Sequence, residues 1–158
     1  MKTIIIYDSL YGNTKVIAKA ITKDMPIGSV ETFDVSEVEV DCLIPADLII
    51  FGSPTHGGQP KQAMQEFLRK IPVNALSGKQ VAAFDTRFLE AEHNWPLRLL
   101  MKTTGYAAPK MLKVLERQGG RKIASPQGFI VTGKEGLFRD GEVERAMAWG
   151  KELLSLVA

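Results

Sequence analysis

Hydrophobic residues along this chain alternate between short continuous runs and runs of helical periodicity. The continuous runs are typical of strands buried on both faces of a parallel sheet. The second strand segment is shorter and more polar, which indicates a strand nearer an edge. The predicted strands span residues 3–8, 30–35, 47–52, 80–84 and 122–131, the last of them interrupted around Pro126.

Between these runs, hydrophobic residues recur every three to four positions, which predicts amphipathic helices. The short crossover at residues 36–45 predicts one or two irregular helical turns. Asp140 is expected to cap the last helix, with Glu142 and Glu144 in its first turn, where the helix dipole favours acidic side chains. The other predicted helices span residues 14–23, 62–71 and 110–117, whereas residues 88–106 show no readable pattern.

The alternation of strands and helices predicts an α/β fold, in which a parallel sheet carries helices on both faces. A length of 158 residues fits a single domain, residues 1–158. The longest apolar runs, such as residues 48–51, are far too short to span a membrane. Cys42 is the only cysteine and is expected to be a small buried residue in a protein of the reducing cytoplasm. A net charge of +2 gives no general case for nucleic-acid binding, and the sequence contains no metal-binding cluster or Walker loop.

The most informative segment is the turn between the first predicted strand and the first predicted helix. Gly12 stands where the backbone must bend sharply. Free N–H groups at a helix start and small hydroxyl side chains together bind a phosphate well. No lysine or arginine lies between residues 3 and 14, so hydrogen bonds and the helix dipole are expected to hold the anion. This suits a phosphomonoester better than a triphosphate. The polar residues of the turn are Ser9, Tyr11, Asn13 and Thr14.

The same segment resembles the FMN-phosphate loop of the flavodoxin family. The family pattern has two aliphatic residues, an aromatic, any residue, Ser or Thr, two free positions, a small residue, one free position and Thr. Three free positions, Ala, two more free positions and an aliphatic residue complete it. The matching residues are Ile5, Ile6, Tyr7, Ser9, Gly12, Thr14, Ala18 and Ile21, and none departs from the pattern.

The resemblance extends from residue 4 to residue 154 and implies non-covalently bound FMN. It implies a flavodoxin-like three-layer sandwich, and five strands with a site after the first suggest the sheet order 2-1-3-4-5. Ser9, Asn13 and Thr14 would offer side-chain donors to the phosphate, and the backbone from Leu10 to Thr14 would offer N–H groups. Thr14 is alternatively a plain helix N-cap, and one hydroxyl can serve in both ways.

Ligands of such sheets bind beyond the carboxyl ends of the strands, where two further polar loops are expected. The loop at residues 53–60 resembles the isoalloxazine loop of the family, which often reads Ser-Pro-Thr, an aromatic residue and Gly-Gly. Ser53, Pro54 and Thr55 match this pattern, and His56 stands in the aromatic position. His56 either stacks on the flavin ring or offers a proton to a substrate, or it simply faces solvent.

Gly57 and Gly58 permit backbone conformations closed to other residues. In the flavodoxin family, a peptide of this loop can turn so that its carbonyl accepts a hydrogen bond from N5 of the reduced flavin. The resemblance therefore implies that Gly57 makes such a turn possible at low cost in this chain.

A third loop, Asp85-Thr86-Arg87-Phe88, follows the fourth strand at the height of the ring. Thr86 and Arg87 are expected to meet the pyrimidine edge of the flavin, and a cation there favours the anionic reduced ring and raises the reduction potential. Arg87 alternatively forms a surface ion pair with Asp85. Phe88 or Trp95 is expected to cover one face of the ring, unless it belongs to the core.

Two classes of function fit an FMN-binding fold. An electron-transfer module passes electrons through the exposed flavin edge to a redox partner protein and needs no substrate pocket, and the short chain favours it. The charge balance does not, because electron-carrying flavodoxins are typically strongly acidic and this chain is slightly basic.

The alternative is an FMN-dependent NAD(P)H:quinone-type oxidoreductase, a class that includes protoporphyrinogen-oxidising relatives. His56 would then protonate an acceptor such as a quinone, and the basic stretch Arg98–Lys122 and the segment Phe88–Tyr106 would form a substrate or subunit surface. A simpler interpretation of the basic residues there is a solvated helix face. A flavodoxin fold without flavin is disfavoured by the intact first loop. The basic residues are Arg98, Lys102, Lys110, Lys113, Arg117, Arg121 and Lys122.

Overall fold

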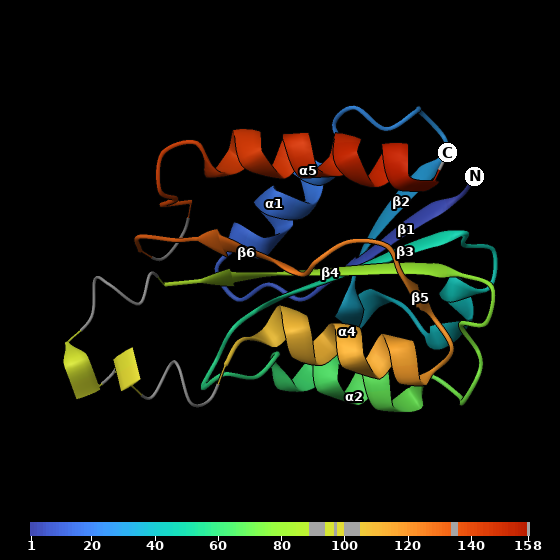
Figure 1. The fold of residues 1–158 in the computed structure, drawn as a ribbon, viewed down its shortest axis with the longest axis horizontal. Helices are drawn as coiled ribbons and strands as arrows, with labels where there is room; N and C mark the ends of the chain where they lie inside the picture. The colour runs from blue at the N-terminus through green and yellow to red at the C-terminus, as the bar shows by residue number, and fades with distance from the viewer. Residues whose placement is uncertain (89–93, 97, 100–104, 134–135, 158) are drawn as a thin grey trace.

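The protein folds around one parallel sheet, seen in a computed structural model that describes residues 1–88, 94–96, 98–99, 105–133 and 136–157 (Figure 1). The strand order is β2-β1-β3-β4-β5, which confirms the predicted order 2-1-3-4-5. All pairings are parallel. The strands are β1 (Thr3–Tyr7), β2 (Val30–Asp34), β3 (Leu48–Pro54), β4 (Gln80–Arg87), β5 (Arg121–Lys122) and β6 (Gln127–Ile130).

The fifth strand is interrupted, as the proline in this segment predicts. Both β5 and β6 pair with β4, the first beside Gln80 and Val81 and the second beside residues 84–87. Pro126 lies between them and has no N–H to donate to a sheet ladder. The β6 strand is thus an addition to the five strands expected. Its outer edge is bonded to side chains of helix α5 (Glu142–Val157), because the Ile130 N–H donates to Glu142 at 2.6 Å and Arg145 donates to the Gly128 carbonyl.

In the part of the chain that the structure describes, four α-helices cover the two faces of the sheet (Figure 1). Helices α1 (Asn13–Thr22) and α5 (Glu142–Val157) lie on one face, and α2 (Gln62–Lys70) and α4 (Ala107–Arg117) lie on the other. The short crossover contains two irregular helical turns, as predicted: η1 (Val35–Glu37) and η2 (Val40–Leu43). Within the described part of the chain, no helix is both long enough and apolar enough to cross a membrane.

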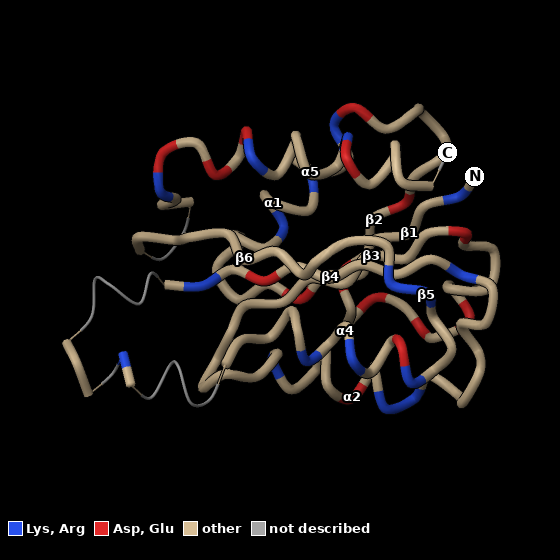
Figure 2. The backbone as a smooth tube through the Cα atoms, viewed as in Figure 1, with Lys and Arg blue, Asp and Glu red and all other residues tan. Residues whose placement is uncertain are grey.

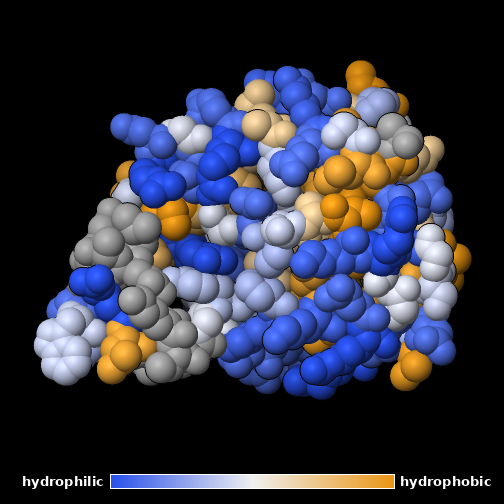
Figure 3. Space-filling view, viewed as in Figure 1, coloured by the Kyte–Doolittle hydropathy of each residue, from blue (hydrophilic) through white to orange (hydrophobic). Residues whose placement is uncertain are grey.

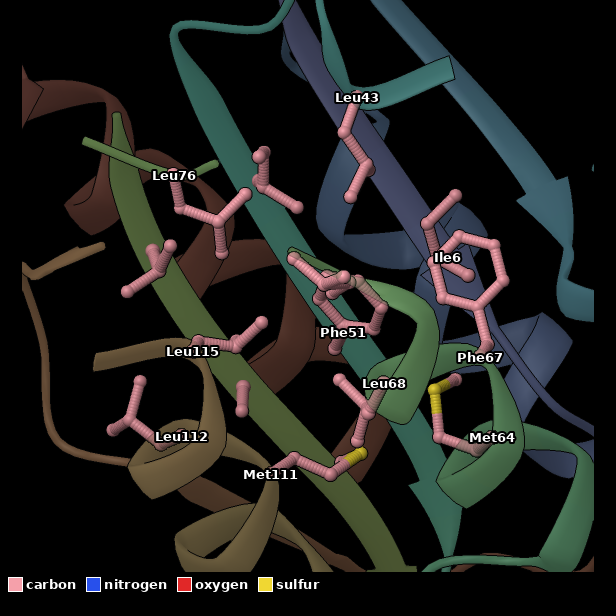
Figure 4. Packing of buried hydrophobic residues seen from close by; sticks show 14 of the residues in the cluster. Ile6, Leu43, Phe51, Met64, Phe67, Leu68, Leu76, Met111, Leu112 and Leu115 are labelled. Atoms are coloured by element: carbon pink, nitrogen blue, oxygen red, sulfur yellow. The ribbon is translucent and has the colours of Figure 1, made fainter. Parts of the chain in front are cut away.

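Alternation along the buried strands divides the hydrophobic core into two layers. Ile4 and Ile6 of β1 point toward α2 and α4, whereas Ile5 and Tyr7 point toward α1 and α5. Figure 4 shows the first layer, in which side chains of α2 and α4 meet Phe51 of β3. Each fully buried side chain of this kind stabilises the fold by about 1.5–3 kcal/mol. The strands are therefore held firmly up to their carboxyl ends, where the loops begin.

Three predicted helix starts are wrong by one to three residues. Helix α1 begins at Asn13 with Gly12 in the cap position, so Thr14 lies inside the helix and is not its N-cap. Helix α4 begins at Ala107, three residues before the predicted start. Helix α5 begins at Glu142 and its first hydrogen bond is accepted by Gly141, so Asp140 lies before the cap position. In α4 the first N–H groups bond to other parts of the fold, a signal that local sequence does not contain.

Candidate functional site

A cleft of about 270 Å³ lies at the carboxyl ends of the strands. The three predicted loops contribute to it, together with a fourth loop that follows β6. The first loop contributes Ser9, Leu10, Tyr11, Asn13 and Thr14. The end of β3 and the second loop contribute Pro54, Thr55 and His56. The end of β4 and the residue after it contribute Thr86, Arg87 and Phe88, and the fourth loop contributes Val131 and Gly133.

The first loop is shaped by Gly12, although Gly12 itself does not line the cleft. Its φ of 90° is open to glycine and strained for other residues. The bend lets the Gly12 N–H donate to Ser9 Oγ at 3.0 Å, and the Ser9 hydroxyl keeps its own proton for a ligand. The hydroxyls of Thr14 and Thr86 lie 3.1 Å apart in a hydrogen bond that joins the first turn of α1 to the end of β4. The loop thus presents small polar groups next to the start of α1.

Asn13 joins the first loop to the fourth. Its amide nitrogen donates to the Gly133 carbonyl at 3.5 Å, and its amide oxygen accepts from the Gly136 N–H. The side chain predicted to bind a phosphate is therefore also engaged in holding the fourth loop. Sequence reasoning missed Val131 and Gly133. A usable signal existed, because the loop after the fifth strand must also leave the carboxyl edge of the sheet.

The second loop ends in a tight turn between His56 and Gln59. The two residues exchange backbone hydrogen bonds of 2.8 and 3.0 Å, and Gly57 and Gly58 between them have φ of 55° and 76°. Two positive φ values in succession define a type I′ turn, which explains the Gly-Gly pair. His56 is exposed and lines the cleft, so it faces both the ligand space and solvent.

Two members of the second loop face away from the cleft. The Gly58 carbonyl accepts a hydrogen bond of 2.6 Å from Lys110 Nζ of α4. Ser53 is completely buried and its hydroxyl accepts from the Lys61 N–H at 3.0 Å. Neither residue is among those that line the cleft, nor is Gly57. These residues shape the loop from behind.

The predicted end of the fourth strand is wrong by three residues, because Asp85, Thr86 and Arg87 belong to β4 and pair there with β6. Asp85 and Arg87 form an ion pair that is not on the surface: the Asp85 side chain is completely buried and the Arg87 side chain is 18% exposed. Arg87 donates two hydrogen bonds to the Asp85 carboxylate, of 2.6 and 2.7 Å, and Asp85 has no exposed surface. Burial raises the pKa of Asp85, and the hydrogen bonds and charge of Arg87 oppose this rise only in part. Asp85 also accepts from the Ala108 N–H at 2.9 Å, so it serves as a cap for α4.

Arg87 lines the cleft with its charge already partnered. The guanidinium lies 3.6 Å from the centre of the Tyr106 ring, a cation–π contact. A Cβ at Gly128 would lie 2.2 Å from its central carbon, so the glycine makes room for this arrangement. Phe88 beside it is half-exposed and lines the cleft, whereas Trp95 is 73% exposed and does not. His93 and Lys102 lie outside the described residues.

The chemistry of the lining is that of a nucleotide site with few charges. Arg87 is the one charged side chain among the described residues that line the cleft. Hydroxyls and helix-start N–H groups gather at the first loop, and the half-exposed side chains of Leu10, Tyr11 and Phe88 supply apolar surface. Such a cleft suits a ligand that carries one phosphate and a flat apolar ring system.

A doubly wound parallel sheet with this cleft defines the class of nucleotide-binding α/β proteins. A family model described as flavodoxin domain matches residues 4–127, which is most of the chain, and the chain belongs to the flavodoxin family. Family membership supports FMN as the cofactor. No curated protein sequence matches this chain significantly.

Solved structures show the same fold at low sequence identity. Oxidised flavodoxin 1 from Bacillus cereus superposes with a TM-score of 0.76 at 20% identity, over 98% of both chains. A flavodoxin from the domain Archaea gives 0.75 at 23% identity, over 99% of both chains. A Fusobacterium nucleatum flavodoxin bound to flavin mononucleotide gives 0.67 at 21% identity, over 98% of both chains. These likenesses extend over β6 and α5, most of which lies beyond the family match.

Proposed function

We propose that this protein carries electrons by means of FMN bound in the cleft. The observation that supports this most directly is that a loop of small hydroxyls and helix-start N–H groups shares one cleft with half-exposed apolar side chains. A flavin supplies one- and two-electron redox chemistry, and the protein supplies position and field. A redox partner protein, or a small-molecule acceptor such as a quinone, would exchange electrons at the open side.

Under this proposal, each part of FMN would contact a different set of cleft residues. The N–H groups from Leu10 to Thr14 and the hydroxyls of Ser9 and Thr14 would hold the phosphate. Residues 54–56 and Phe88 would pack on the ring, and Thr86 and Arg87 would lie near its polar edge. The other predicted residues, Gly12, Ser53, Gly57, Gly58 and Asp85, would act by shaping these loops.

A second candidate is an FMN-dependent NAD(P)H:quinone-type oxidoreductase. Two observations favour it: the net charge of +2, which differs from that of strongly acidic carriers, and the exposed His56 at the cleft. An imidazole at this place could donate a proton to an acceptor. Under this alternative, NAD(P)H would be the electron donor.

The visible spectrum of the purified protein with added FMN tests the proposal, and a dithionite titration then separates the two candidates. A carrier should bind FMN, be reduced in separable one-electron steps and show no turnover. NADPH-dependent quinone reduction above the rate of free FMN would establish the oxidoreductase. Protein that stays colourless after incubation with FMN and gel filtration would refute both.

A further inference from the structure

A partly buried ion pair lies at the base of the first loop, and neither of its residues is among those that line the cleft. Asp8 is the last residue before Ser9, and its side chain is 6% exposed. Its Oδ1 is 2.9 Å from Nζ of Lys61, which comes from the cap position of α2. The other carboxylate oxygen, Oδ2, is buried and has no hydrogen-bond partner in the part of the chain that the structure describes. One lysine therefore compensates the charge of Asp8.

This acid is poorly placed for a phosphate-binding loop unless it is compensated. The loop has no lysine or arginine of its own between residues 3 and 14. A phosphomonoester carries about −1.5 to −2 charges near neutral pH. A bare carboxylate at the base of the loop would repel it, and burial would strengthen that repulsion by lowering the local dielectric. Lys61 supplies the missing cation from a segment far away in sequence.

We propose that Lys61 is a positioning residue for anion binding, which neutralises Asp8 so that the first loop accepts a phosphate dianion. The proposal rests on the FMN function above and adds to it the residue that makes the loop electrostatically competent. The backbone N–H of Lys61 donates a hydrogen bond of 3.0 Å to Ser53 Oγ, and this contact does not depend on the Lys61 side chain. The Lys61 side chain compensates the charge of Asp8, whereas the Lys61 backbone fixes the conformation of the second loop.

Comparison of FMN with riboflavin tests the proposal, because oxidised riboflavin lacks the charged phosphate. In Lys61→Met, which keeps side-chain length, we expect the Kd for FMN to rise at least about tenfold. The Kd for riboflavin should change by less than about threefold, because the electrostatic repulsion between a neutral ligand and the carboxylate is small. Equal losses for both ligands, or no loss for FMN, would overturn the proposal.

Removal of the acid provides a rescue. The double variant Asp8→Asn/Lys61→Met should restore FMN affinity to within about threefold of the wild type, since neither charge remains. Asp8→Asn alone should bind FMN more tightly than the wild type, because Lys61 is then uncompensated. This single variant also keeps the proposal testable if Lys61→Met does not fold. A double variant as weak as Lys61→Met would contradict the electrostatic account.

Lys70→Met is the matched control. Lys70 also belongs to α2 and pairs with Glu39 at 3.5 Å, but both side chains are largely exposed, at 60% and 79%. The variant removes the same charge from the same helix without touching the first loop. Its Kd for FMN should stay within about twofold of the wild type. A loss equal to that of Lys61→Met would mean that net charge alone is responsible.

Inorganic phosphate separates failure of this proposal from failure of the FMN proposal. Wild-type protein that binds no FMN refutes the FMN function. Titration of the FMN-free protein with phosphate should still shift the amide resonances of residues 10–14 in the wild type, and more weakly in Lys61→Met. If phosphate shifts neither set, or shifts both equally, the role of Lys61 is refuted as well.

Discussion

Arg87 and Asp85 form an ion pair of which only Arg87 lines the cleft. Removal of the arginine therefore does more than delete a cation, because it leaves a buried acid near the ligand without a compensating charge. In Arg87→Ala, the two-electron potential of bound FMN should fall by roughly 20–50 mV. The upper end of this range follows from an interaction of about 2 kcal/mol at ~8 Å and a dielectric of 20, converted for two electrons, and the lower end from roughly twice that dielectric.

Potentiometric titration of the FMN-loaded protein measures this shift. Arg117→Ala, at the far end of α4, removes an equal charge from an exposed position and should leave the potential unchanged. An unchanged or raised potential in Arg87→Ala would contradict the assignment of Arg87 to the ring.

Glu142 should make the fold sensitive to acid. The carboxyl is buried, which by itself raises its pKa, but hydrogen bonds from Arg145, the Ile130 N–H and Arg139, with the charge of Arg145, hold the pKa below its ordinary value. A lowered pKa in the folded state means that this stabilisation is present above about pH 4.5 and is lost as pH falls through the folded pKa. Glu142→Gln should therefore reduce the free energy of unfolding at neutral pH by about 2 kcal/mol.

Urea unfolding between neutral and acid pH checks the expected slope. The wild type should lose more stability on acidification than Glu142→Gln does. Glu144→Gln is the control, because Glu144 lies in the same helical turn but is exposed. If the free energy of unfolding falls equally with pH in the wild type and in Glu142→Gln, this carboxyl does not cause the loss of stability in acid.

At the scale of single residues, the sequence predicted which loops line the cleft, but it did not predict which hydrogen bonds and ion pairs fix those loops in place. Ser9 follows a buried strand and Thr14 lies in the first turn of a helix, so their placement at the cleft needs only local reasoning. Lys61 reaches Asp8 across 53 residues of sequence, and its partner depends on how α2 approaches the sheet. That approach is a result of packing and has no local signature. The same holds for Asn13 and the fourth loop.

At the scale of elements, the first turn of α4 fastens two cleft loops. The Ala107 N–H donates to Thr55 Oγ1 at 3.0 Å, the Ala108 N–H donates to Asp85, and Lys110 donates to the Gly58 carbonyl. In Lys110→Met the turn at residues 56–59 should open more often, because a charge-assisted hydrogen bond contributes about 1.5–3 kcal/mol. Amide hydrogen exchange of Gln59 should then accelerate at least about tenfold.

The matched control is Lys113→Met, which removes an equal charge from an exposed position of the same helix. Its Gln59 amide should exchange at the wild-type rate. Amides of the buried strand β3 should remain protected in both variants. Equal acceleration in the two variants would assign the effect to helix charge and not to the bond with Gly58.

Most elements were predictable because their signals are local, and the exceptions have tertiary causes. The interruption at Pro126 follows from the missing N–H of proline. The start of α4 was missed because Thr55 and Asp85 cap it from other loops. The close packing of α5 on α1 was also not predicted. It requires a glycine at position 150, because a Cβ there would lie 2.0 Å from the Ile21 carbonyl oxygen. Only the arrangement of both helices reveals that constraint.

At the scale of the whole molecule, charges of both signs are spread over both helical layers (Figure 2). The surface over α2 and α4 is mainly hydrophilic, and hydrophobic surface on the same face lies between α5 and the sheet (Figure 3). The basic residues between 98 and 122 differ in their surroundings. Lys110 donates a hydrogen bond to the Gly58 carbonyl, whereas Lys113, Arg117, Arg121 and Lys122 are exposed. Among the described residues, this distribution favours a solvated surface over one strong docking field.

The net charge of the FMN-loaded protein should lie near zero, because the chain carries +2 and the phosphate contributes about −1.5 to −2. Electrostatic steering should then be weak for acceptors of either sign. Stopped-flow oxidation of the reduced protein by ferricyanide and by hexaammineruthenium(III) tests this. Between about 0.01 M and 0.1 M ionic strength the screening length falls from ~30 Å to ~10 Å, yet each rate should change by less than about twofold. A steep fall with ferricyanide alone would instead locate a basic docking field near the cleft, and would favour an acidic partner over a neutral quinone.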